Sequence, residues 1–337
     1  MGDKRFVRAL AVLLLLVVGA AVKAGGEASL AEAVASLQGQ DSITILITDS
    51  GLGGLSVAAS LEHRLQSCHP FKNVHLVFAN ALPNNDHTYN SMSDTHEKAV
   101  AFDSALNGFV EHYHPSIILI ACNTLSVVYP ETEFAKSGSV PVYGIVDFGV
   151  EGALQKLASD STSTAIILGT PTTAESHAHA DGLEAHGISP ARLTTQGCEM
   201  LESEIQADPN SDIVRTMIEM YAMEALEKNP PKDSSSVEIA LCCTHYGYAK
   251  SAFKSVFEEQ LGYPVTVIDP NEAMASAVLA NTKCNRFPEG SVTVDVVTRA
   301  ELGVDDVNSI ASMLEPVSPA TAEALRMHTL DTNLFTY

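Results

Sequence analysis

The stretch SITILITDSGLGG, residues 42–54, decides the fold of this chain of 337 residues. Its first half, Ser42–Thr48, is a β-branched and apolar run typical of a buried strand. Its second half is a polar, glycine-rich turn into an apolar helix, which we expect to begin near Leu55. A strand, a tight turn and a helix form the repeating unit of parallel α/β sheets, whose ligands bind at the carboxyl ends of the strands. Asp49 and Ser50 therefore stand where a binding site is expected.

Two further strand-like runs each end in a cysteine. Ile117–Ala121 leads into Cys122, and Val237–Leu241 leads into Cys242 and Cys243. Both Cys122 and Cys243 should lie at carboxyl ends of strands, on the same side of the molecule as the glycine-rich turn. Inversion of a carbon stereocentre requires proton removal on one face and delivery on the other, which two facing thiols can perform as base and acid. The paired cysteines therefore predict a racemase.

The remaining strand-like runs alternate with helical stretches of ten or more residues, which predicts parallel sheets with helices on both faces. A hydrophobic content of 46% is enough for one large core or two ordinary ones, and the paired cysteine motifs favour two domains. The further strands are expected at Val74–Phe78, Val142–Val146, Ala165–Leu168, Val265–Ile268 and Val292–Val297.

The first 24 residues have the pattern of an export signal. Lys4, Arg5 and Arg8 precede the uncharged stretch Ala9–Val22, and small residues allow cleavage before Gly25. The apolar stretch is shorter than the ~20 residues of a membrane-spanning helix, so an uncleaved anchor is the weaker interpretation. We expect an exported protein, periplasmic or secreted, with no integral membrane span after cleavage. Residues 25–41 are expected to be a weak helix or a mobile lead-in.

Charge limits the partners. Removal of residues 1–24 deletes four basic side chains and one acidic one, which takes the formal charge from −22 to −25. So acidic a surface repels nucleic acid and anionic lipid at long range, and we expect no nucleic-acid partner. A small anionic ligand is still compatible, because backbone N–H groups in a closed site can hold a carboxylate. The expected partner is an amino-acid substrate, with a homodimer as one possible assembly.

The six cysteines do not form a compact disulfide framework by spacing, and disulfides among the non-catalytic ones are left open. Cys122 and Cys243 must stay reduced to act as acid and base, even in an oxidising compartment. Cys242 points to the other side of an extended chain from Cys243, so we interpret it as structural. The cysteines are Cys68, Cys122, Cys198, Cys242, Cys243 and Cys284.

Cofactor and metal sites are not predicted. The turn at residues 49–54 lacks the Lys-Ser/Thr ending of a P-loop and the spacing of a dinucleotide fingerprint. A pyridoxal enzyme needs a lysine in a phosphate-binding setting, and no lysine here has one. Two histidine pairs lack thiols or carboxylates at ligand spacing, so we expect exposure to solvent rather than metal binding. These pairs are His112 with His114 and His177 with His179.

Three strings together carry a resemblance: DSGLGGL at residues 49–55, ACNT at 121–124 and CTHY at 243–246. In this order and at strand ends, the chain resembles the cofactor-independent aspartate/glutamate racemase superfamily, most of all glutamate racemase. The resemblance covers roughly residues 42–314. It implies two pseudo-symmetric, doubly wound α/β domains with the active site in the cleft between them. The first domain would comprise residues 42–144 and 263–315, the second residues 145–262, and a peripheral tail residues 316–337.

The resemblance also assigns roles. It implies that Cys122 and Cys243 act as a thiolate and thiol that exchange roles with the direction of turnover. Asp49 would support Cys122, and His245 would support Cys243. The residues implied to bind substrate are Asp49, Ser50, Tyr89, Asn90, Asn123, Thr124, Thr244 and His245.

Several departures from the family pattern bear on the substrate. The segment Asn80–Asn90 replaces a shorter loop that in the family touches the substrate's side-chain carboxylate, with Tyr89 and Asn90 as the nearest match. Gln206 stands where the family has an auxiliary glutamate, unless Glu204 takes that place. Gly247 and Cys242 replace a family proline and glycine.

The substrate and the class of protein have alternatives. Glutamate is expected, because aspartate racemases usually carry an acid where His245 stands, while aspartate or a broader set of amino acids is the alternative. A single-cysteine isomerase or decarboxylase of the superfamily is disfavoured by the second cysteine. A protein of another class, an exported amino-acid-binding protein on a racemase scaffold, would bind its ligand without exchanging the α-hydrogen.

Overall fold

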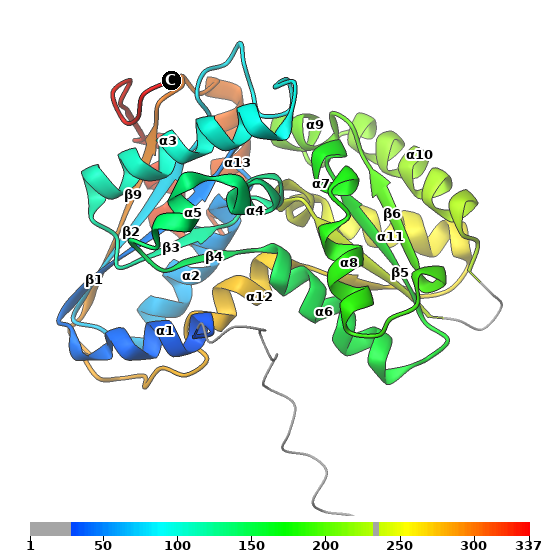
Figure 1. Cartoon of the computed structure of the whole chain (residues 1–337), viewed down its shortest axis with the longest axis horizontal. Helices are drawn as coiled ribbons and strands as arrows, with labels where there is room; N and C mark the ends of the chain where they lie inside the picture. The colour runs from blue at the N-terminus through cyan, green and yellow to red at the C-terminus, as the bar shows by residue number, and fades with distance from the viewer. Residues whose placement is uncertain (1–27, 232–235) are drawn as a thin grey trace, which may run out of the picture.

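The computed structural model describes residues 28–231 and 236–337. It consists of two parallel sheets side by side, each covered by helices on both faces (Figure 1). The first sheet has the strand order β10-β9-β2-β1-β3-β4, and the second has the order β6-β5-β7-β8. The predicted α/β fold with two doubly wound parallel sheets is confirmed. The expected export signal, residues 1–24, lies outside the described residues.

The strands of both sheets are short and all parallel to their neighbours. The first sheet contains β1 (Ser42–Asp49), β2 (Asn73–Asn80), β3 (Ile117–Ile120), β4 (Val142–Gly144), β9 (Ser291–Thr298) and β10 (Thr329–Leu330). The second sheet contains β5 (Thr164–Gly169), β6 (Leu193–Gly197), β7 (Val237–Cys242) and β8 (Thr266–Ile268).

Helices of the first domain fill the crossovers of its sheet. They are α1 (Leu30–Ser36), α2 (Leu55–Cys68), α3 (Thr95–Tyr113), α4 (Asn123–Val128), α5 (Glu133–Ser137), α12 (Pro270–Ala277), α13 (Val304–Leu314) and α14 (Pro319–Arg326), with 3₁₀ turns η1 (Leu37–Gly39) and η2 (Tyr129–Glu131). Helix α2 begins at Leu55, as the sequence predicts.

Helices of the second domain pack on the shorter sheet. They are α6 (Val146–Ser159), α7 (Pro171–Glu175), α8 (Ala178–Ala185), α9 (Leu201–Ala207), α10 (Asp212–Lys228) and α11 (Lys250–Leu261), with 3₁₀ turns η3 (Pro190–Arg192) and η4 (Thr244–Ala249).

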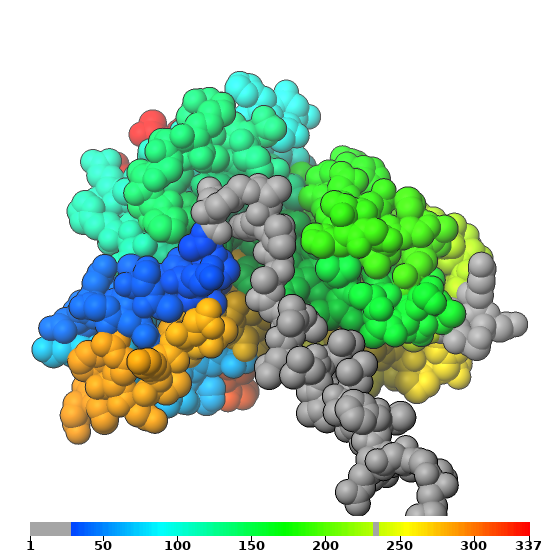
Figure 2. Space-filling view, turned by 60° about the horizontal axis from the view of Figure 1, so that its bottom comes forward, coloured from blue at the N-terminus to red at the C-terminus, as the bar shows by residue number. Residues whose placement is uncertain are grey.

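Each sheet has one apolar layer on either face because its strands alternate their side chains. In β1, Ile45 and Ile47 pack with α2, α12, α13 and α14, whereas Leu46 packs on the opposite face with α3. In β5, Leu168 packs with α10 and α11, and Ile167 packs with α6 and α8. Helix α1 adds its apolar face to the first of these layers, and Figure 2 shows it in blue beside the orange segment that follows α12.

The return to the first domain occurs later than predicted. The sequence-based boundary placed residues 263–315 in the first domain, but β8 pairs with β7 and therefore extends the second sheet. The short run Thr266–Ile268 satisfies its backbone hydrogen bonds at the free edge of β7. The chain re-enters the first domain with α12, whose Met274 and Ala275 join the layer around α2.

The prediction of a peripheral tail is wrong. Residues 316–337 form α14, the strand β10 at the edge of the first sheet, and a buried end segment. Leu325 and Leu334 are completely buried, and Phe335 is nearly so. The sequence pattern missed this segment because its few apolar residues are spread over two short elements rather than one long periodic run.

Two other features were not predicted. Strand β6 reads LTTQG, without the apolar run that marks the other strands, and it pairs with β5 at the edge of the second sheet. A disulfide joins Cys68 at the end of α2 to Cys284, 216 residues along the chain. Spacing along the sequence carries no signal for a bridge of this length, because only the fold brings the two ends together. Cys122, Cys198, Cys242 and Cys243 are free and buried.

Within residues 28–231 and 236–337, no helix combines the length and apolar character that a membrane crossing requires.

Candidate active site

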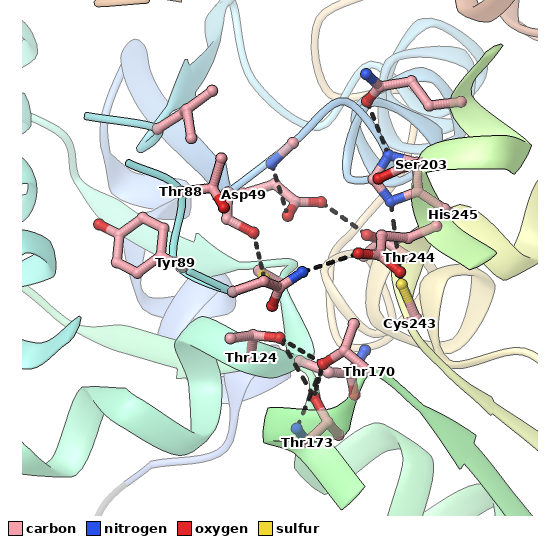
Figure 3. A pocket seen from close by; sticks show the side chains of 18 of the residues that line it. Asp49, Thr88, Tyr89, Thr124, Thr170, Thr173, Ser203, Cys243, Thr244 and His245 are labelled. Atoms are coloured by element: carbon pink, nitrogen blue, oxygen red, sulfur yellow. Dashed lines mark hydrogen bonds between the residues drawn. The ribbon is translucent and has the colours of Figure 1, made fainter. Parts of the chain in front are cut away.

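A cavity of about 190 Å³ lies between the two domains, at the carboxyl ends of β1, β3, β5 and β7. Figure 3 shows Thr88 and Tyr89 on the side opposite His245, with Thr124, Thr170 and Thr173 gathered at one end. The cavity brings together every residue that the sequence singled out for the site. These are Asp49, Ser50, Tyr89, Asn90, Cys122, Asn123, Thr124, Cys243, Thr244 and His245.

The Asp49 carboxylate joins the two domains. Its Oδ2 accepts a hydrogen bond from the Gly54 N–H at 2.5 Å. The same oxygen accepts from the Thr244 hydroxyl at 2.8 Å (Figure 3). Asp49 and Thr244 are both almost completely buried. Charge-assisted hydrogen bonds in such a setting are stronger than neutral ones, so this carboxylate fixes the end of β1 against the segment that follows β7.

The glycines of the turn allow the second domain to approach closely. A Cβ on Gly53 would meet the Thr244 hydroxyl oxygen first, and would lie 2.6 Å from the His245 backbone nitrogen and 2.8 Å from its Nδ1. A Cβ on Gly51 would lie 2.9 Å from the His245 ring. The absence of side chains at these positions, rather than any positive φ angle, is what the fold requires here. The turn thus serves as a docking surface for His245.

Cys122 is the N-cap of α4. Its Sγ lies 3.2 Å from the Ser50 Oγ and accepts a hydrogen bond from the Leu125 N–H at 3.4 Å. Burial, together with the negative charge of Asp49, raises the pKa of the Cys122 thiol far above its ordinary value. Ser50 is therefore the direct partner of this thiol, while Asp49 acts on it through charge.

Cys243 follows β7 and faces His245. The Cys243 Sγ lies 4.0 Å from the His245 Nδ1. Burial first, and then the nearby Glu202 carboxylate, raise the pKa of the Cys243 thiol well above its ordinary value. Cys242 packs with Ala240 on the opposite face of β7 from Cys243, and it also contributes to the cavity wall.

Gln206 determines which nitrogen of His245 carries the hydrogen. Its Oε1 lies 3.0 Å from the His245 Nε2 and also accepts from the Leu52 N–H at 3.3 Å, while its Nε2 donates to Asp306 at 3.0 Å. Because an amide oxygen can only accept, His245 carries its hydrogen on Nε2 and turns the Nδ1 lone pair towards Cys243. Burial lowers the pKa of His245. Gln206, and not Glu204, lines the cavity.

Sequence reasoning missed other residues that line the cavity. Glu202 accepts a hydrogen bond from the Asn90 Nδ2 at 2.8 Å, which links the domains at a second point, and burial raises its pKa. The Thr170 hydroxyl lies 2.9 Å from that of Thr124 and 3.1 Å from that of Thr173. Thr170 directly follows β5 and could have been found by the strand-end argument, whereas Glu202 lies on α9 and has no such signal.

The histidine pairs do not form metal sites in the described part of the chain, where no group of three or more His, Cys, Asp or Glu side chains is placed to hold an ion. His112, His114 and His177 are exposed. His179 is buried, contrary to expectation, because α8 packs its ring against Gly149 of α6. This burial lowers the pKa of His179 to about 4.

Comparisons with known proteins agree with this geometry. Residues 45–278 match the family described as Asp/Glu/Hydantoin racemase. The glutamate racemase of Aquifex pyrophilus is 27% identical over 230 residues, 68% of this chain and 79% of the relative. That of Shewanella sp. (strain MR-7) is 29% identical over 296 residues, 86% of this chain and 98% of the relative.

Solved structures have the same fold. Glutamate racemase from Francisella tularensis subsp. tularensis SCHU S4, in complex with D-glutamate, has a TM-score of 0.63 at 20% identity, covering 83% of this chain and 96% of that one. The Campylobacter jejuni subsp. jejuni enzyme has a TM-score of 0.61 at 19% identity, covering 81% of this chain and 97% of that one.

Because the family match spans residues 45–278, the chain belongs to the Asp/Glu/Hydantoin racemase family. It is an isomerase of the amino-acid racemase class.

The close approach at Gly53 generates a prediction. Gly53→Ala should destabilise the protein by about 1–3 kcal/mol, because the new methyl group displaces Thr244 and His245, and should lower kcat/KM by about 10²-fold. The matched control is Gly39→Ala, where an added Cβ has nothing within 4 Å. Denaturant unfolding and racemase assays measure both effects. Equal behaviour of the two variants would show that the turn does not position His245.

Proposed function

We propose that this racemase interconverts the L and D forms of glutamate by a two-base mechanism, with Cys122 and Cys243 as the bases. The observation that carries the proposal is the placement of the buried free thiols of Cys122, from the first domain, and Cys243, from the second, in a single cavity. Each thiol has its own polar partner, Ser50 for Cys122 and His245 for Cys243.

Proton transfer starts from a protonated thiol. The His245 Nδ1 takes the proton of Cys243, and the resulting thiolate removes the α-hydrogen from one face of the substrate. The Cys122 thiol then gives its proton to the opposite face of the carbanion, which restores the C–H bond with inverted configuration. Cys122 is left as thiolate, Cys243 as thiol and His245 as imidazolium. The next turnover runs in the reverse sense, or the His245 proton passes through solvent to Cys122 and resets the site.

Uncharged groups are available to hold the substrate. Neither lysine nor arginine occurs among the described residues that line the cavity. Both amide atoms of Asn123 and the hydroxyl of Tyr89 are buried without a hydrogen-bond partner in the described chain. Buried polar groups are normally paired, so these atoms are suited to the substrate's ammonium and carboxylate groups. The hydroxyls of Thr124 and Thr170 extend this polar surface.

Glutamate as the substrate is supported by the names of the relatives and by the D-glutamate in the Francisella complex. Glu202 lines the cavity, and burial raises its pKa. Aspartate or a broader set of amino acids is the alternative, since the segment that carries Tyr89 and Asn90 departs from the family pattern.

The first prediction concerns the two thiols. Cys122→Ser and Cys243→Ser should each lower racemisation by about 10²- to 10⁴-fold, because each removes one of the two proton carriers. Cys198→Ala, which removes a buried thiol that does not line the cavity, should leave activity intact. Proton NMR in deuterated buffer, with reductant and without pyridoxal phosphate, measures α-hydrogen exchange for both enantiomers of glutamate and aspartate.

The same experiment decides between classes of protein. Folded, reduced protein that binds one of these amino acids but exchanges no α-hydrogen would overturn the mechanism and support a binding protein on a racemase scaffold.

The second prediction concerns the tautomer of His245. Gln206→Glu places a carboxylate 3.0 Å from the His245 Nε2, and such a charge raises a histidine pKa by about 1–3 units. The base form of His245 is neutral, so the acidic limb of the kcat/KM profile should move to higher pH. Gln155→Glu, on the exposed face of α6, is the control and should leave the limb in place. An unmoved limb in Gln206→Glu would exclude His245 as the base for Cys243.

We also infer that the protein is exported after removal of residues 1–24. The Cys68–Cys284 disulfide supports this, because disulfides persist in oxidising compartments. Burial of Cys122 and Cys243 protects both thiols from exchange there. Protein recovered from its native source should begin at Gly25, and a non-reducing peptide map should contain the bridge. An intact N-terminus together with free thiols at Cys68 and Cys284 would contradict export.

A further inference from the structure

The segment between β2 and α3, residues 81–94, brings Thr88, Tyr89 and Asn90 to the cavity without helix or strand of its own. Its internal hydrogen bonds are local. The Asn84 Oδ1 accepts from the backbone N–H groups of Asp86 at 3.0 Å and His87 at 2.7 Å. Such turns shape the start of the segment, but they do not fix it relative to the sheet.

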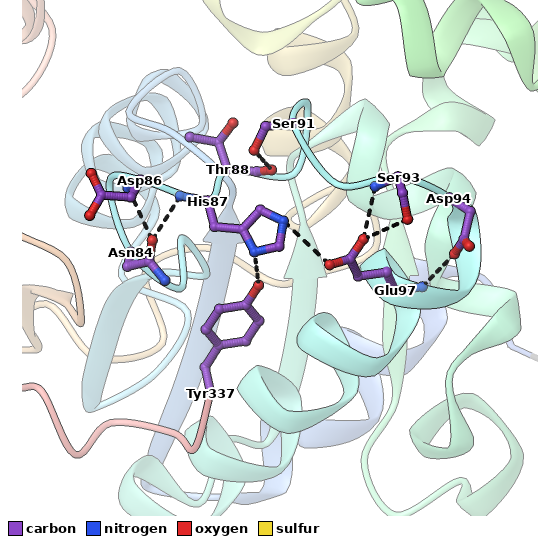
Figure 4. Close-up of polar contacts among 9 residues, drawn as sticks. All are labelled: Asn84, Asp86, His87, Thr88, Ser91, Ser93, Asp94, Glu97 and Tyr337. Atoms are coloured by element: carbon purple, nitrogen blue, oxygen red, sulfur yellow. Dashed lines mark hydrogen bonds and ion pairs between the residues drawn. The ribbon is translucent and has the colours of Figure 1, made fainter.

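His87 connects this segment to two distant parts of the chain (Figure 4). Its Nδ1 lies 2.7 Å from the hydroxyl of Tyr337, and its Nε2 lies 3.3 Å from the Glu97 Oε1. Burial raises the pKa of Tyr337, which keeps the phenol as a donor to Nδ1. His87 therefore carries its hydrogen on Nε2, the nitrogen that faces Glu97.

Glu97 ties the same contact to the start of α3. Its Oε2 accepts from both the backbone N–H of Ser93, at 2.8 Å, and the Ser93 hydroxyl, at 2.9 Å. These hydrogen bonds lower the pKa of Glu97 and keep it ionised as an acceptor for His87. The Glu97 carboxylate thus contacts both Ser93, near the end of the segment, and His87, near its middle.

Tyr337 is itself held by buried neighbours. Leu334 and Phe335 are buried, and Phe335 packs edge-on against Phe109 of α3 with ring centroids 5.8 Å apart. The Ser104 hydroxyl donates to the Thr336 carbonyl at 2.5 Å. The phenol of Tyr337 therefore extends from an anchored piece of chain rather than from a free end.

Arg299, just after β9, joins the two pieces of chain directly. Its Nε donates to the Phe335 carbonyl at 2.9 Å, and its Nη1 donates to the Pro83 carbonyl. A neighbouring contact runs from the Asn85 Nδ2 to the Glu301 carbonyl at 3.0 Å. The end segment and residues 82–88 are therefore cross-linked at two places, Arg299 and the Tyr337–His87 pair.

We propose that Tyr337, acting through His87, is a positioning residue that holds residues 82–92 in the shape that presents Thr88, Tyr89 and Asn90 to the substrate. Neither Tyr337 nor His87 lines the cavity, so both act only through the segment. The proposal rests on the proposed function where it concerns substrate binding, and on geometry alone where it concerns the segment.

The test compares Tyr337→Phe with a matched control, Tyr143→Phe, which removes an exposed hydroxyl bonded to the Ala28 carbonyl far from the segment. Hydrogen–deuterium exchange of peptides within residues 82–94 should accelerate about 3- to 10-fold in Tyr337→Phe, the effect of one lost hydrogen bond. KM for the amino acid that the parent enzyme racemises should rise by a similar factor, with kcat within about twofold. Tyr143→Phe should change neither quantity.

His87 supplies a rescue. His87→Ala should reproduce the effect of Tyr337→Phe. His87→Gln should keep exchange and KM close to the values of the parent, because an amide can accept from the phenol and donate to Glu97. Equal exchange in Tyr337→Phe and Tyr143→Phe would overturn the proposal. So would a fall in kcat without a rise in KM. If the parent enzyme racemises no amino acid, the proposed function fails, and the exchange data alone decide the role of Tyr337.

Discussion

The hydrogen bond from the Thr244 hydroxyl to the Asp49 carboxylate is the contact on which the site depends. It joins the end of β1 in one sheet to the segment after β7 in the other. The approach is close because the turn after Asp49 consists largely of glycine, and the His245 backbone occupies the space that side chains would fill. This contact brings the ends of β3 and β7 together, so the thiols that follow these strands line one cavity.

The same closeness determines the electrostatics. Burial raises the pKa values of Cys122 and Cys243, and the carboxylates of Asp49 and Glu202 raise them further. Both thiols are therefore protonated at neutral pH, and the proposed mechanism requires a thiolate to be made during turnover. In that mechanism His245, held by an amide and not by a carboxylate, is the group placed to make it. The proposed chemistry thus begins from an uncharged pair, which costs less to bury than an ion pair.

The sequence predicts most of the site residues, because the end of a strand is a local feature of the sequence. The run before Asp49, the two cysteines after apolar strands and His245 place the site without any knowledge of tertiary contacts. The features that the sequence does not predict depend on contacts between residues far apart in the chain. Strand β6 is polar and exists because β5 offers an edge, and His179 is buried only because α8 meets Gly149. Glu202 reaches the cavity from a helix face that no strand-end pattern marks, and Tyr337 reaches His87 across 250 residues.

The disulfide determines which parts of the chain stay covalently connected after a backbone cut. Cys68 and Cys284 lie in the first domain, so the bridge closes a ring that contains the whole second domain. In the chain-entropy account, closure of a ring this long stabilises the folded state by about 5 kcal/mol. A single backbone cut between these cysteines would open the ring without dividing the molecule. Both halves of the cavity, Cys122 and Cys243 included, would remain in one covalent piece, so a protease would need at least two cuts to separate them.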